Sequence, residues 1–402
     1  MTRQVAALFV LQLALLTIGL TRDYQLKHED NNELHATFAR AHLRLGLDVT
    51  HGQNYFYNPA SGTGSFYANH PPGPGLLLAL VYRITGHDGP ATTRLVAVTS
   101  HVLAAWLFLG IARRVLPRRW EVTAALLLFI VLPESAFFGR MVNHEVLALP
   151  GALLLVRSYW EGVRGTWPRE RWLPALLGGA VWATAMGWPG FFAVGACIVH
   201  ALLEVRVRRN PRARPALVAL VSAGVGAGGA VLVQLLWVLG GNPGHLWSLL
   251  VARSAGEGDR QPLAWIGRIL ELHWRYFGVT SAIALAAVVA RVVGPSLRRE
   301  VDPAEEIAFV FLLAGAGYVV AFLFNATKHD YWQFLLLPAS ALAIVLLLRR
   351  VLAVRRPVLR RAVVGLVVLD LAAVTIVTLV RRQTKPEGYC IQAVQLMRRN
   401  HL

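Results

Sequence analysis

Long apolar runs separated by short arginine-rich connections dominate this 402-residue sequence. Hydrophobic residues make up 55% of the chain and charged residues only 15%, so much of the apolar surface must face lipid rather than water. A helix needs about 20 apolar residues to cross the hydrocarbon core of a bilayer. The apolar runs therefore predict an all-α polytopic membrane protein with about eleven spans, at residues 5–20, 92–112, 121–138, 146–160, 172–187, 189–204, 215–239, 277–294, 307–325, 332–348 and 362–380.

The arginines predict how these spans are oriented. The net charge is +18, and the arginines come in bursts at 113–120, 205–214 and 349–361. Arginine-rich loops resist translocation, so all three bursts are expected on the cytoplasmic side, with the N-terminus inside. This pattern favours contact with anionic lipid and gives no reason to expect nucleic acid as a partner. The expected organisation is one transmembrane domain, residues 1–380, followed by a short outer-face tail, 381–402.

The first outer loop, 21–91, is expected to hold two helices that lie at the membrane surface. Within 31–46, Leu34, Phe38 and Leu45 recur at helical spacing, with charged residues on the other faces. The second segment, 72–86, has an apolar core too short to span. Keeping it at the interface also keeps all the arginine bursts on one side.

Polar residues that are not explained as topology signals gather on the predicted outer face. They are His28, Glu29, Asp30, His70, Arg140, Asn143, His144, Glu145, Lys328, His329 and Asp330. This one-sided distribution indicates a functional site at the outer surface.

Asp30 has two compatible interpretations. The sequence Asp-Asn-Asn-Glu, 30–33, fits a capping box in which Asp30 is the N-cap and Glu33 lies three residues further on. Asp30 also fits a general base at the bilayer interface, where desolvation raises the pKa of a carboxyl group.

Four ordered motifs resemble the GT-C membrane glycosyltransferases. More closely, they resemble the bacterial branch with protein-mannosyltransferase-like and aminoarabinose-transferase-like enzymes. An acidic residue ends the first span, and the element Asn-His-Pro-Pro-Gly, 69–73, opens an interfacial helix. The segments 137–160 and 179–203 resemble the second outer loop with its following span and the paired fifth and sixth helices. "KHDYWQFLLLPASALAI", 328–344, is similar to a late motif of the family.

The resemblance implies a GT-C-type helix bundle that transfers a sugar from a polyprenyl-phosphate donor to an acceptor hydroxyl, with inversion. The first-loop aspartate of the family is its expected base, which corresponds to Asp30 here, with Glu29 as the neighbouring alternative. Glu145 corresponds to the second-loop acidic residue, where the family often has Asp. The acceptor is left open between a glycan, a lipid and a protein. The implied location is the outer face of the bacterial inner membrane.

Asp30, His144 and Glu145 are candidate ligands for a divalent metal, which is Mn²⁺, Zn²⁺ or Mg²⁺. Imidazole and carboxylate suit Mn²⁺ or Zn²⁺ better than Mg²⁺. The alternative is that His144 and Glu145 simply begin a helix, with Glu145 near the positive end of its dipole. No organic cofactor is expected.

The remaining candidates would bind substrate. Lys328 and Arg140 are predicted to clamp the donor phosphate, although Lys328 is equally explained as a cation that snorkels to the interface. Trp188 either stacks on a sugar or anchors a helix turn at the headgroups. The other predicted contacts are His70, Asn143, His329 and Tyr331.

Two other protein classes fit the same topology. A transporter or flippase of a lipid-linked substrate would place polar residues near the middle of spans, often in Gly/Pro-broken helices. A non-catalytic scaffold would give no reason for the one-sided polar residues. The crowding of polar residues at one interface favours surface chemistry.

Overall fold

The structure, a computed structural model, describes residues 3–58, 61–255, 261–293, 301–384 and 386–401, and it is almost entirely helical. The first part contains α1 (Arg3–Thr17), α2 (Asp30–Leu45), α3 (Leu47–Thr50), β1 (Tyr55–Asn58), β2 (Thr63–Phe66), α4 (Gly73–Thr85), α5 (Pro90–Val115), α6 (Arg119–Val131), α7 (Pro133–Phe138) and α8 (His144–Arg164). It continues with α9 (Arg169–Met186), α10 (Trp188–Arg206), α11 (Ala213–Val238), α12 (Pro243–Ala255) and α13 (Pro262–Val293). The last part contains α14 (Pro303–Ala321), α15 (Leu323–Lys328), the 3-10 helix η2 (Asp330–Leu336), α16 (Leu337–Leu352), α17 (Pro357–Thr384) and α18 (Gly388–His401).

The described residues include eight helices that are long and apolar enough to cross a membrane. They are α5, α8, α10, α11, α13, α14, η2 with α16, and α17. The predicted all-α polytopic membrane fold is therefore confirmed. Each of the eleven predicted apolar runs coincides with a helix, but α1, α6 and α9 do not reach the same length and hydropathy. The count of eleven spans stays a prediction.

One predicted span, 121–138, is interrupted, and the helix that contains the span 277–294 is kinked at the start of that span. The run 121–138 divides into α6 and α7 at Pro133, which has no backbone N–H to continue the hydrogen-bond ladder of α6. Helix α13 is kinked at Gly278, where φ is 80°, a backbone conformation that glycine adopts readily.

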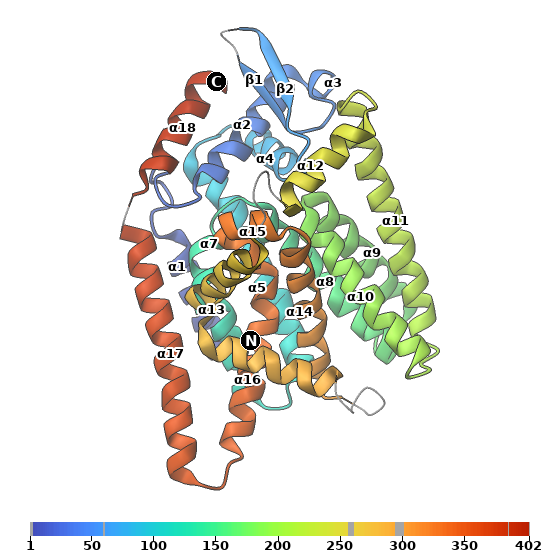
Figure 1. The fold of residues 1–402 in the computed structure, drawn as a ribbon, viewed down its shortest axis with the longest axis vertical. Coiled ribbons are helices and arrows are strands. Elements are labelled where there is room, and N and C mark those ends of the chain that lie inside the picture. The colour runs from blue at the N-terminus through green and yellow to red at the C-terminus, as the bar shows by residue number, and fades with distance from the viewer. Residues whose placement is uncertain (1–2, 59–60, 256–260, 294–300, 385, 402) are drawn as a thin grey trace.

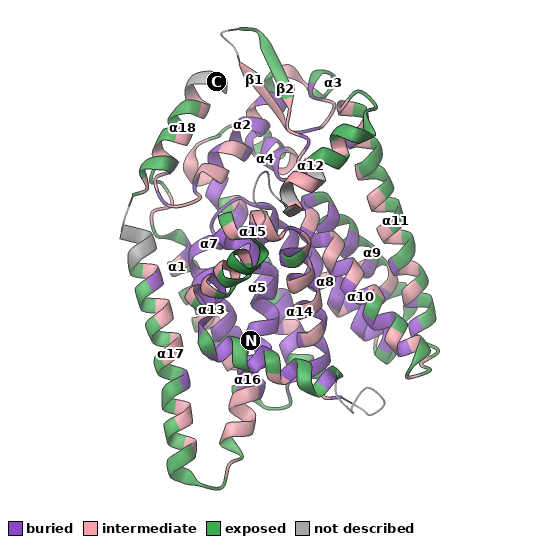
Figure 2. Ribbon diagram, viewed as in Figure 1, coloured by how far each residue is buried: buried purple, intermediate pink, exposed green. Residues whose placement is uncertain are grey.

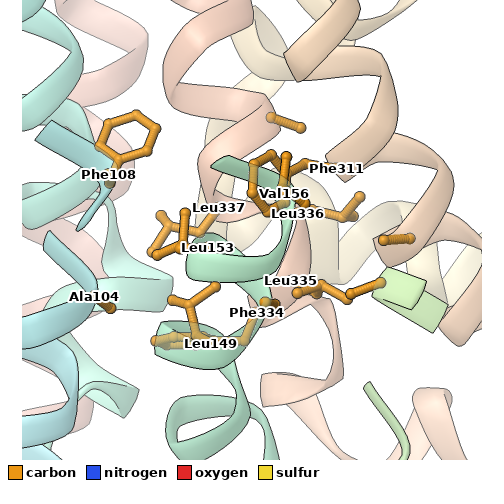
Figure 3. Close-up of a cluster of buried hydrophobic side chains, with 14 of the residues drawn as sticks. Ala104, Phe108, Leu149, Leu153, Val156, Phe311, Phe334, Leu335, Leu336 and Leu337 are labelled. Atoms are coloured by element: carbon orange, nitrogen blue, oxygen red, sulfur yellow. The ribbon is translucent and has the colours of Figure 1, made fainter. Parts of the chain in front are cut away.

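The hydrophobic core lies around α8, which packs against α5, α9 and α10. In its most apolar stretch, 89% of the residues are buried, and Figure 2 shows the buried residues concentrated in the centre of the bundle. Figure 3 shows Leu149 and Leu153 of α8 among side chains from α5, α14 and η2, including Phe108, Phe311 and Phe334. By contrast, only 17% of the apolar stretch of α11 and 11% of that of α17 is buried, so these helices present their apolar side chains to lipid.

The bundle has two distinct ends (Figure 1). One end, called here the loop end, carries α2, α3, α4, the two strands and α18. The other, called the arginine-rich end, carries the connections between α10 and α11 and between α16 and α17. Helix α18 packs on α2, and Arg398 pairs with Asp23 (2.7 Å) and Glu33 (3.2 Å). The tail and the first loop thus lie together at the loop end; that this end is the outer face stays a prediction.

The first loop contains three helices, α2, α3 and α4, and a hairpin. Helix α4 has 13 residues and is therefore about 20 Å long, which is too short to span the hydrocarbon core. Its start approaches α9 so closely that a Cβ at Gly73 would lie 2.3 Å from the Ala185 carbonyl oxygen. The antiparallel pair β1–β2 was not expected, although aromatic residues such as those of Tyr55–Asn58 favour strands.

Candidate active site

Five segments that are distant in sequence meet at the loop end. The ring of His70, just before α4, stacks on that of His144 at 3.9 Å, with an interplanar angle of 14°. Trp188, at the start of α10, donates its indole N–H to the Asn69 carbonyl at 2.8 Å. The ring of His28, before α2, lies 5.2 Å from that of Tyr331 in η2. The structure therefore brings together all five of the segments in which the predicted site residues lie.

Glu29 anchors the chain at the entry to α2. One carboxylate oxygen accepts the backbone N–H groups of Gln25 and Leu26, both at 3.0 Å. The other lies 3.0 Å from the Arg94 guanidinium and 3.7 Å from that of Arg140. Glu29 and Arg94 are both buried. Both oxygens of this carboxylate are thus engaged by donors of the chain itself, so Glu29 suits a structural role better than that of a base.

Asp30 is the first residue of α2 and is only half buried. Burial raises the pKa of its carboxyl group, while the charge of His28 opposes this effect. Among the residues that the structure describes, the Asp30 carboxylate forms no ion pair, and the hydrogen bond found for it comes from the backbone N–H of Asp30 itself. This side chain is therefore available to a substrate.

The predicted capping box is wrong. Glu29, not Asp30, is in the N-cap position, and no side chain caps α2. Glu33 instead pairs with Arg40 and Arg398. The reason is that α2 begins one residue earlier than expected, at Asp30, soon after His28 turns the chain with a φ of 63°.

Asp330 joins the late motif to the first loop. It lies 2.8 Å from the Lys27 ammonium and 3.9 Å from the His28 imidazole, and it accepts the Tyr276 hydroxyl at 2.7 Å. Asp330 is buried, so these contacts compensate its charge. They also fix His28 near Asp30 and Tyr331.

The residues around Asp330 differ in their exposure. Lys328 is exposed, and its ammonium lies 3.9 Å from the centre of the Phe324 ring. His329 is half buried, and its imidazole lies 3.3 Å from the Tyr331 hydroxyl. Tyr331 is buried close enough to Asp30 and Glu145 to interact with them electrostatically. Lys328, His329 and Tyr331 thus place an exposed cation, an imidazole and a phenol close together in the late motif.

Arg140 does not fit the predicted phosphate clamp. Its side chain is only 3% exposed, donates to the Ile18 carbonyl and lies near Glu29. Burial lowers the pKa of this guanidinium, against the charge of Glu29. Arg140 therefore ties the second outer loop to the end of the first helix, which sequence spacing alone does not reveal.

Asn143, His144 and Glu145 begin α8. The Asn143 side chain caps the helix by accepting the Val146 N–H at 2.8 Å. The His144 ring lies 2.6 Å from the Met186 carbonyl oxygen, and Glu145 accepts the Tyr318 hydroxyl at 2.7 Å. The helix-start interpretation therefore describes what these side chains do in the structure.

The predicted metal ligands are not gathered. Among the described residues, Asp30, His144 and Glu145 do not form a group whose ligand atoms lie close enough to share an ion. One nitrogen of His144 is already engaged by Met186, and its ring faces His70. The residues present thus do not fit a metal held by this trio.

A different group does bring three ligand atoms within 4.8 Å of one another: His200, Glu204 and Glu306. It lies at the arginine-rich end, where Arg208 lies 2.6 Å from Glu204 and also contacts Glu306. Arg164 contacts Glu306 as well. A metal there would have to displace guanidinium groups, so an ion-pair network explains this group better than a cation site.

His70 and Trp188 position backbone and rings rather than standing free in a pocket. His70 is buried against His144, and the Trp188 indole holds the segment before α4. The start of α10 can lie this close to the start of α8 because residue 187 is glycine. A Cβ there would lie 2.6 Å from the His144 Cβ. Whether either side chain contacts substrate stays a prediction.

The sequence reasoning missed three buried polar side chains at this end. The His35 ring lies 4.9 Å from that of His144, and burial lowers the pKa of His35 well below its usual value. Tyr318 of α14 reaches Glu145. Glu134 of α7 is fully buried, and neither of its oxygens has a hydrogen-bond partner among the described residues. The available signal for Glu134 was its place well inside the apolar run 121–138, whose other glutamate, Glu121, stands at the first position.

The sequence matches no family model and no curated protein. The structure does resemble solved membrane enzymes. ArnT from Cupriavidus metallidurans, bound to undecaprenyl phosphate, matches with a TM-score of 0.58 and 14% identity over 86% of this chain and 60% of ArnT. The archaeal oligosaccharyltransferase AglB from Archaeoglobus fulgidus, with an inhibitory peptide and a dolichol-phosphate, matches with a TM-score of 0.60 and 13% identity over 95% of this chain and 56% of AglB.

Another structure of the Archaeoglobus fulgidus enzyme, in complex with Zn and sulfate, matches with a TM-score of 0.59 and 13% identity. It covers 95% of this chain and 53% of that one, so this chain spans little more than half the length of these proteins. ArnT and AglB are members of the GT-C superfamily, and the chain has the GT-C fold.

Proposed function

We propose that this protein is an inverting glycosyltransferase that moves a sugar from a polyprenyl-phosphate donor to an acceptor hydroxyl. The observation that carries this proposal is the Asp30 carboxylate. It is half buried at the first residue of α2, without an ion pair among the described residues, at the loop end of a GT-C fold. Folds host many functions, so the argument rests on this side chain and its neighbours.

Asp30 suits the role of general base better than Glu29. Burial raises the pKa of Asp30, and a base with a higher pKa accepts a proton more readily. Glu29 is held by two backbone N–H groups and by Arg94, so both of its carboxylate oxygens are already engaged. We therefore assign Glu29 to positioning: it fixes the backbone directly before Asp30.

The proposed reaction is a single displacement. Asp30 takes the proton of the acceptor hydroxyl as the oxygen attacks the anomeric carbon from the face opposite the phosphate. The bond between the anomeric carbon and the phosphate oxygen breaks, and polyprenyl phosphate leaves with the bonding electrons. The leaving group gains negative charge, which a cation near the phosphate would stabilise.

Lys328 is the cation best placed for that role. It is exposed at the end of α15, next to His329 and Tyr331, whereas Arg140 is buried and engaged. Its contact with the Phe324 ring leaves the ammonium accessible. His329 and Tyr331 are the proposed further contacts to donor or acceptor, and Glu145 supports the site through Tyr318.

The solved neighbours support the class of donor. One binds undecaprenyl phosphate and the other dolichol-phosphate, both of which are polyprenyl phosphates. The polyprenyl tail would lie in the lipid beside the bundle, with the phosphodiester at headgroup level. No step of the proposed reaction is routed through a metal, because the residues of the site do not gather a ligand set.

The proposed orientation places the loop end on the outer face of the bacterial inner membrane. Its support is the separation of the two ends: the arginine-rich connections lie opposite the site, and such connections remain cytoplasmic. The acceptor class is open between a glycan, a lipid and a protein.

The test is sugar transfer by the purified protein in nanodiscs from a panel of radiolabelled polyprenyl-phosphate sugars. Asp30→Asn is expected to lower turnover by about 100-fold or more while the protein remains folded, since a general base contributes about 10² to 10⁴. Asp48→Asn is the matched control, because Asp48 is an exposed carboxylate of the same loop. Its turnover should equal that of the wild type.

Two results would contradict the proposal in different ways. Wild-type turnover by Asp30→Asn would show that Asp30 is not the base. Movement of intact labelled donor across a vesicle membrane, without transfer to any acceptor, would instead identify a flippase.

A further inference from the structure

A cavity of about 470 Å³ lies at the arginine-rich end, away from the proposed active site. It is formed by the last turns of α5, the second half of α8, the α8–α9 connection and the first turn of α9. Four arginines and two tryptophans dominate its wall: Arg113, Arg114, Arg157, Arg171, Trp106 and Trp167. None of these residues takes part in the proposed transfer reaction.

The cavity carries an uncompensated positive charge. Its one acidic residue, Glu161, lies 3.2 Å from the Arg114 guanidinium and accepts the Thr166 hydroxyl. In the part of the chain that the structure describes, Arg113, Arg157 and Arg171 form no ion pair. Three guanidinium groups around one cavity favour an anion that can accept several hydrogen bonds, such as a phosphate.

Arg157 is built into the wall rather than lying on a surface. A Cβ at Gly110 would lie 2.3 Å from one of its terminal nitrogens, so a larger residue at that position would displace the guanidinium. The guanidinium carbons of Arg157 and Arg171 lie 5.2 Å and 4.1 Å from the centre of the Trp167 ring, which orients both groups. The Nε of Arg157 is buried without a hydrogen-bond partner among the described residues. A ligand oxygen would satisfy this donor.

The position of the cavity favours a lipid over a dissolved anion. It lies where α5 and α8 end and α9 begins, which is headgroup level for helices that cross the membrane. Trp106 on its rim is 57% exposed, on a helix whose outer surface faces lipid. Tryptophan is enriched at this depth, and basic pockets between membrane helices on the cytoplasmic side bind phosphate-bearing headgroups.

We propose that this cavity binds the headgroup of an anionic phospholipid from the leaflet at the arginine-rich end. The phosphate lies among Arg113, Arg157 and Arg171, and the acyl chains leave past Trp106 into the bilayer. This site is independent of the proposed transferase reaction.

The test is native mass spectrometry of the full-length protein in detergent, titrated with dioleoyl phosphatidylglycerol. Wild type is expected to retain one phosphatidylglycerol, and phosphatidylethanolamine is expected to bind far more weakly. Arg157→Gln combined with Arg171→Gln should raise the lipid concentration needed for half occupancy at least tenfold. The matched control is Arg355→Gln with Arg356→Gln, which removes two exposed arginines from another connection at the same end. It should bind like the wild type.

Two further variants distinguish loss of the binding site from misfolding and from a general loss of positive charge. Arg171→Gln alone changes an exposed residue and should still weaken binding severalfold. Gly110→Ala keeps all the charges but displaces the Arg157 guanidinium, and it should weaken binding as well. Equal losses in the double variant and in the Arg355/Arg356 control would overturn the proposal. Displacement of the lipid by millimolar inorganic phosphate would overturn the assignment to a lipid.

Discussion

Three carboxylates at the loop end have partners of a different kind from those of the buried glutamates at the arginine-rich end. At the arginine-rich end, each of the five buried glutamates among the described residues contacts at least one arginine; they are Glu121, Glu161, Glu204, Glu305 and Glu306. At the loop end, Asp30 is near His28, Glu145 meets Tyr318, and Asp330 meets Lys27 and Tyr276. Arginine is a permanent cation, so its ion pairs suit a structural role. Histidine, tyrosine and lysine can change their protonation state, so a carboxylate beside them can gain or lose a proton more easily.

Glu29 sharpens this comparison, because it is one of three loop-end carboxylates that pair with arginine, together with Asp23 and Glu33. It lies at the loop end, directly beside Asp30, but it is paired with Arg94 in the manner of the opposite end. Adjacent residues thus have opposite environments: one carboxylate is fixed by arginine and backbone, and the next is left open. The contrast shows that the candidate base is recognised by the absence of an ion pair at its carboxylate among the described residues.

The largest expected effect comes from Glu29→Gln. Removing this charge leaves the buried Arg94 guanidinium uncompensated, so the free energy of unfolding should fall by about 3 kcal/mol. The measurement is denaturant unfolding in detergent micelles, with Asp48→Asn as the control. If Glu29→Gln unfolds like the wild type but transfers no sugar, the roles of Glu29 and Asp30 are reversed.

Glu306→Gln probes the arginine-rich end. It removes the carboxylate that Arg164 and Arg208 share, and the free energy of unfolding should fall by about 2 kcal/mol. Turnover per folded molecule should not change, because the site lies at the other end. Unfolding and sugar transfer are measured on the same preparation. A selective loss of turnover in fully folded protein would show that the two ends are coupled.

Lys328→Gln probes the proposed phosphate contact. Loss of a charged hydrogen bond should raise the KM for the polyprenyl-phosphate donor about tenfold, with little change in kcat. Lys328→Arg keeps the charge and should restore most of the affinity. Steady-state kinetics with varied donor distinguish this outcome from a snorkelling role, in which neither variant would change KM.

The smallest expected effect is a gain in stability in Asp30→Asn. Because burial raises the pKa of Asp30, the folded chain binds this proton more tightly than the unfolded chain does. Ionised Asp30 therefore costs stability above its folded pKa, and the cost vanishes below the ordinary value of 3.8. At pH 7 the variant should melt at a slightly higher temperature than the wild type. An unchanged or lower melting temperature at pH 7 would indicate that Asp30 has a stabilising partner.

Much of the architecture could be predicted from the sequence. The apolar runs predicted the helices, and the arginine bursts predicted the end at which no site residue would lie. The segments around His70 and His144 were expected to share one face, and their rings stack. These features depend on composition and periodicity, which a single sequence contains.

The details of the site could not be predicted in the same way, because they depend on pairings between distant residues. Arg94 lies within a predicted span, and nothing in the sequence connects it with Glu29. The same holds for Arg140, whose partner is the carbonyl of Ile18. The capping box failed because a single turn residue, His28, shifts the start of α2.

The packing of α18 on α2 has a consequence for how the protein is made. Lys27 needs Asp330 from the late motif, and Glu33 and Asp23 need Arg398 from the final helix. The first loop leaves the ribosome long before these partners do. The loop around Asp30 therefore reaches its final form only after the last membrane helix has been inserted. In a partly synthesised chain, the proposed base lies in a loop that still lacks its ion pairs with Asp330 and Arg398.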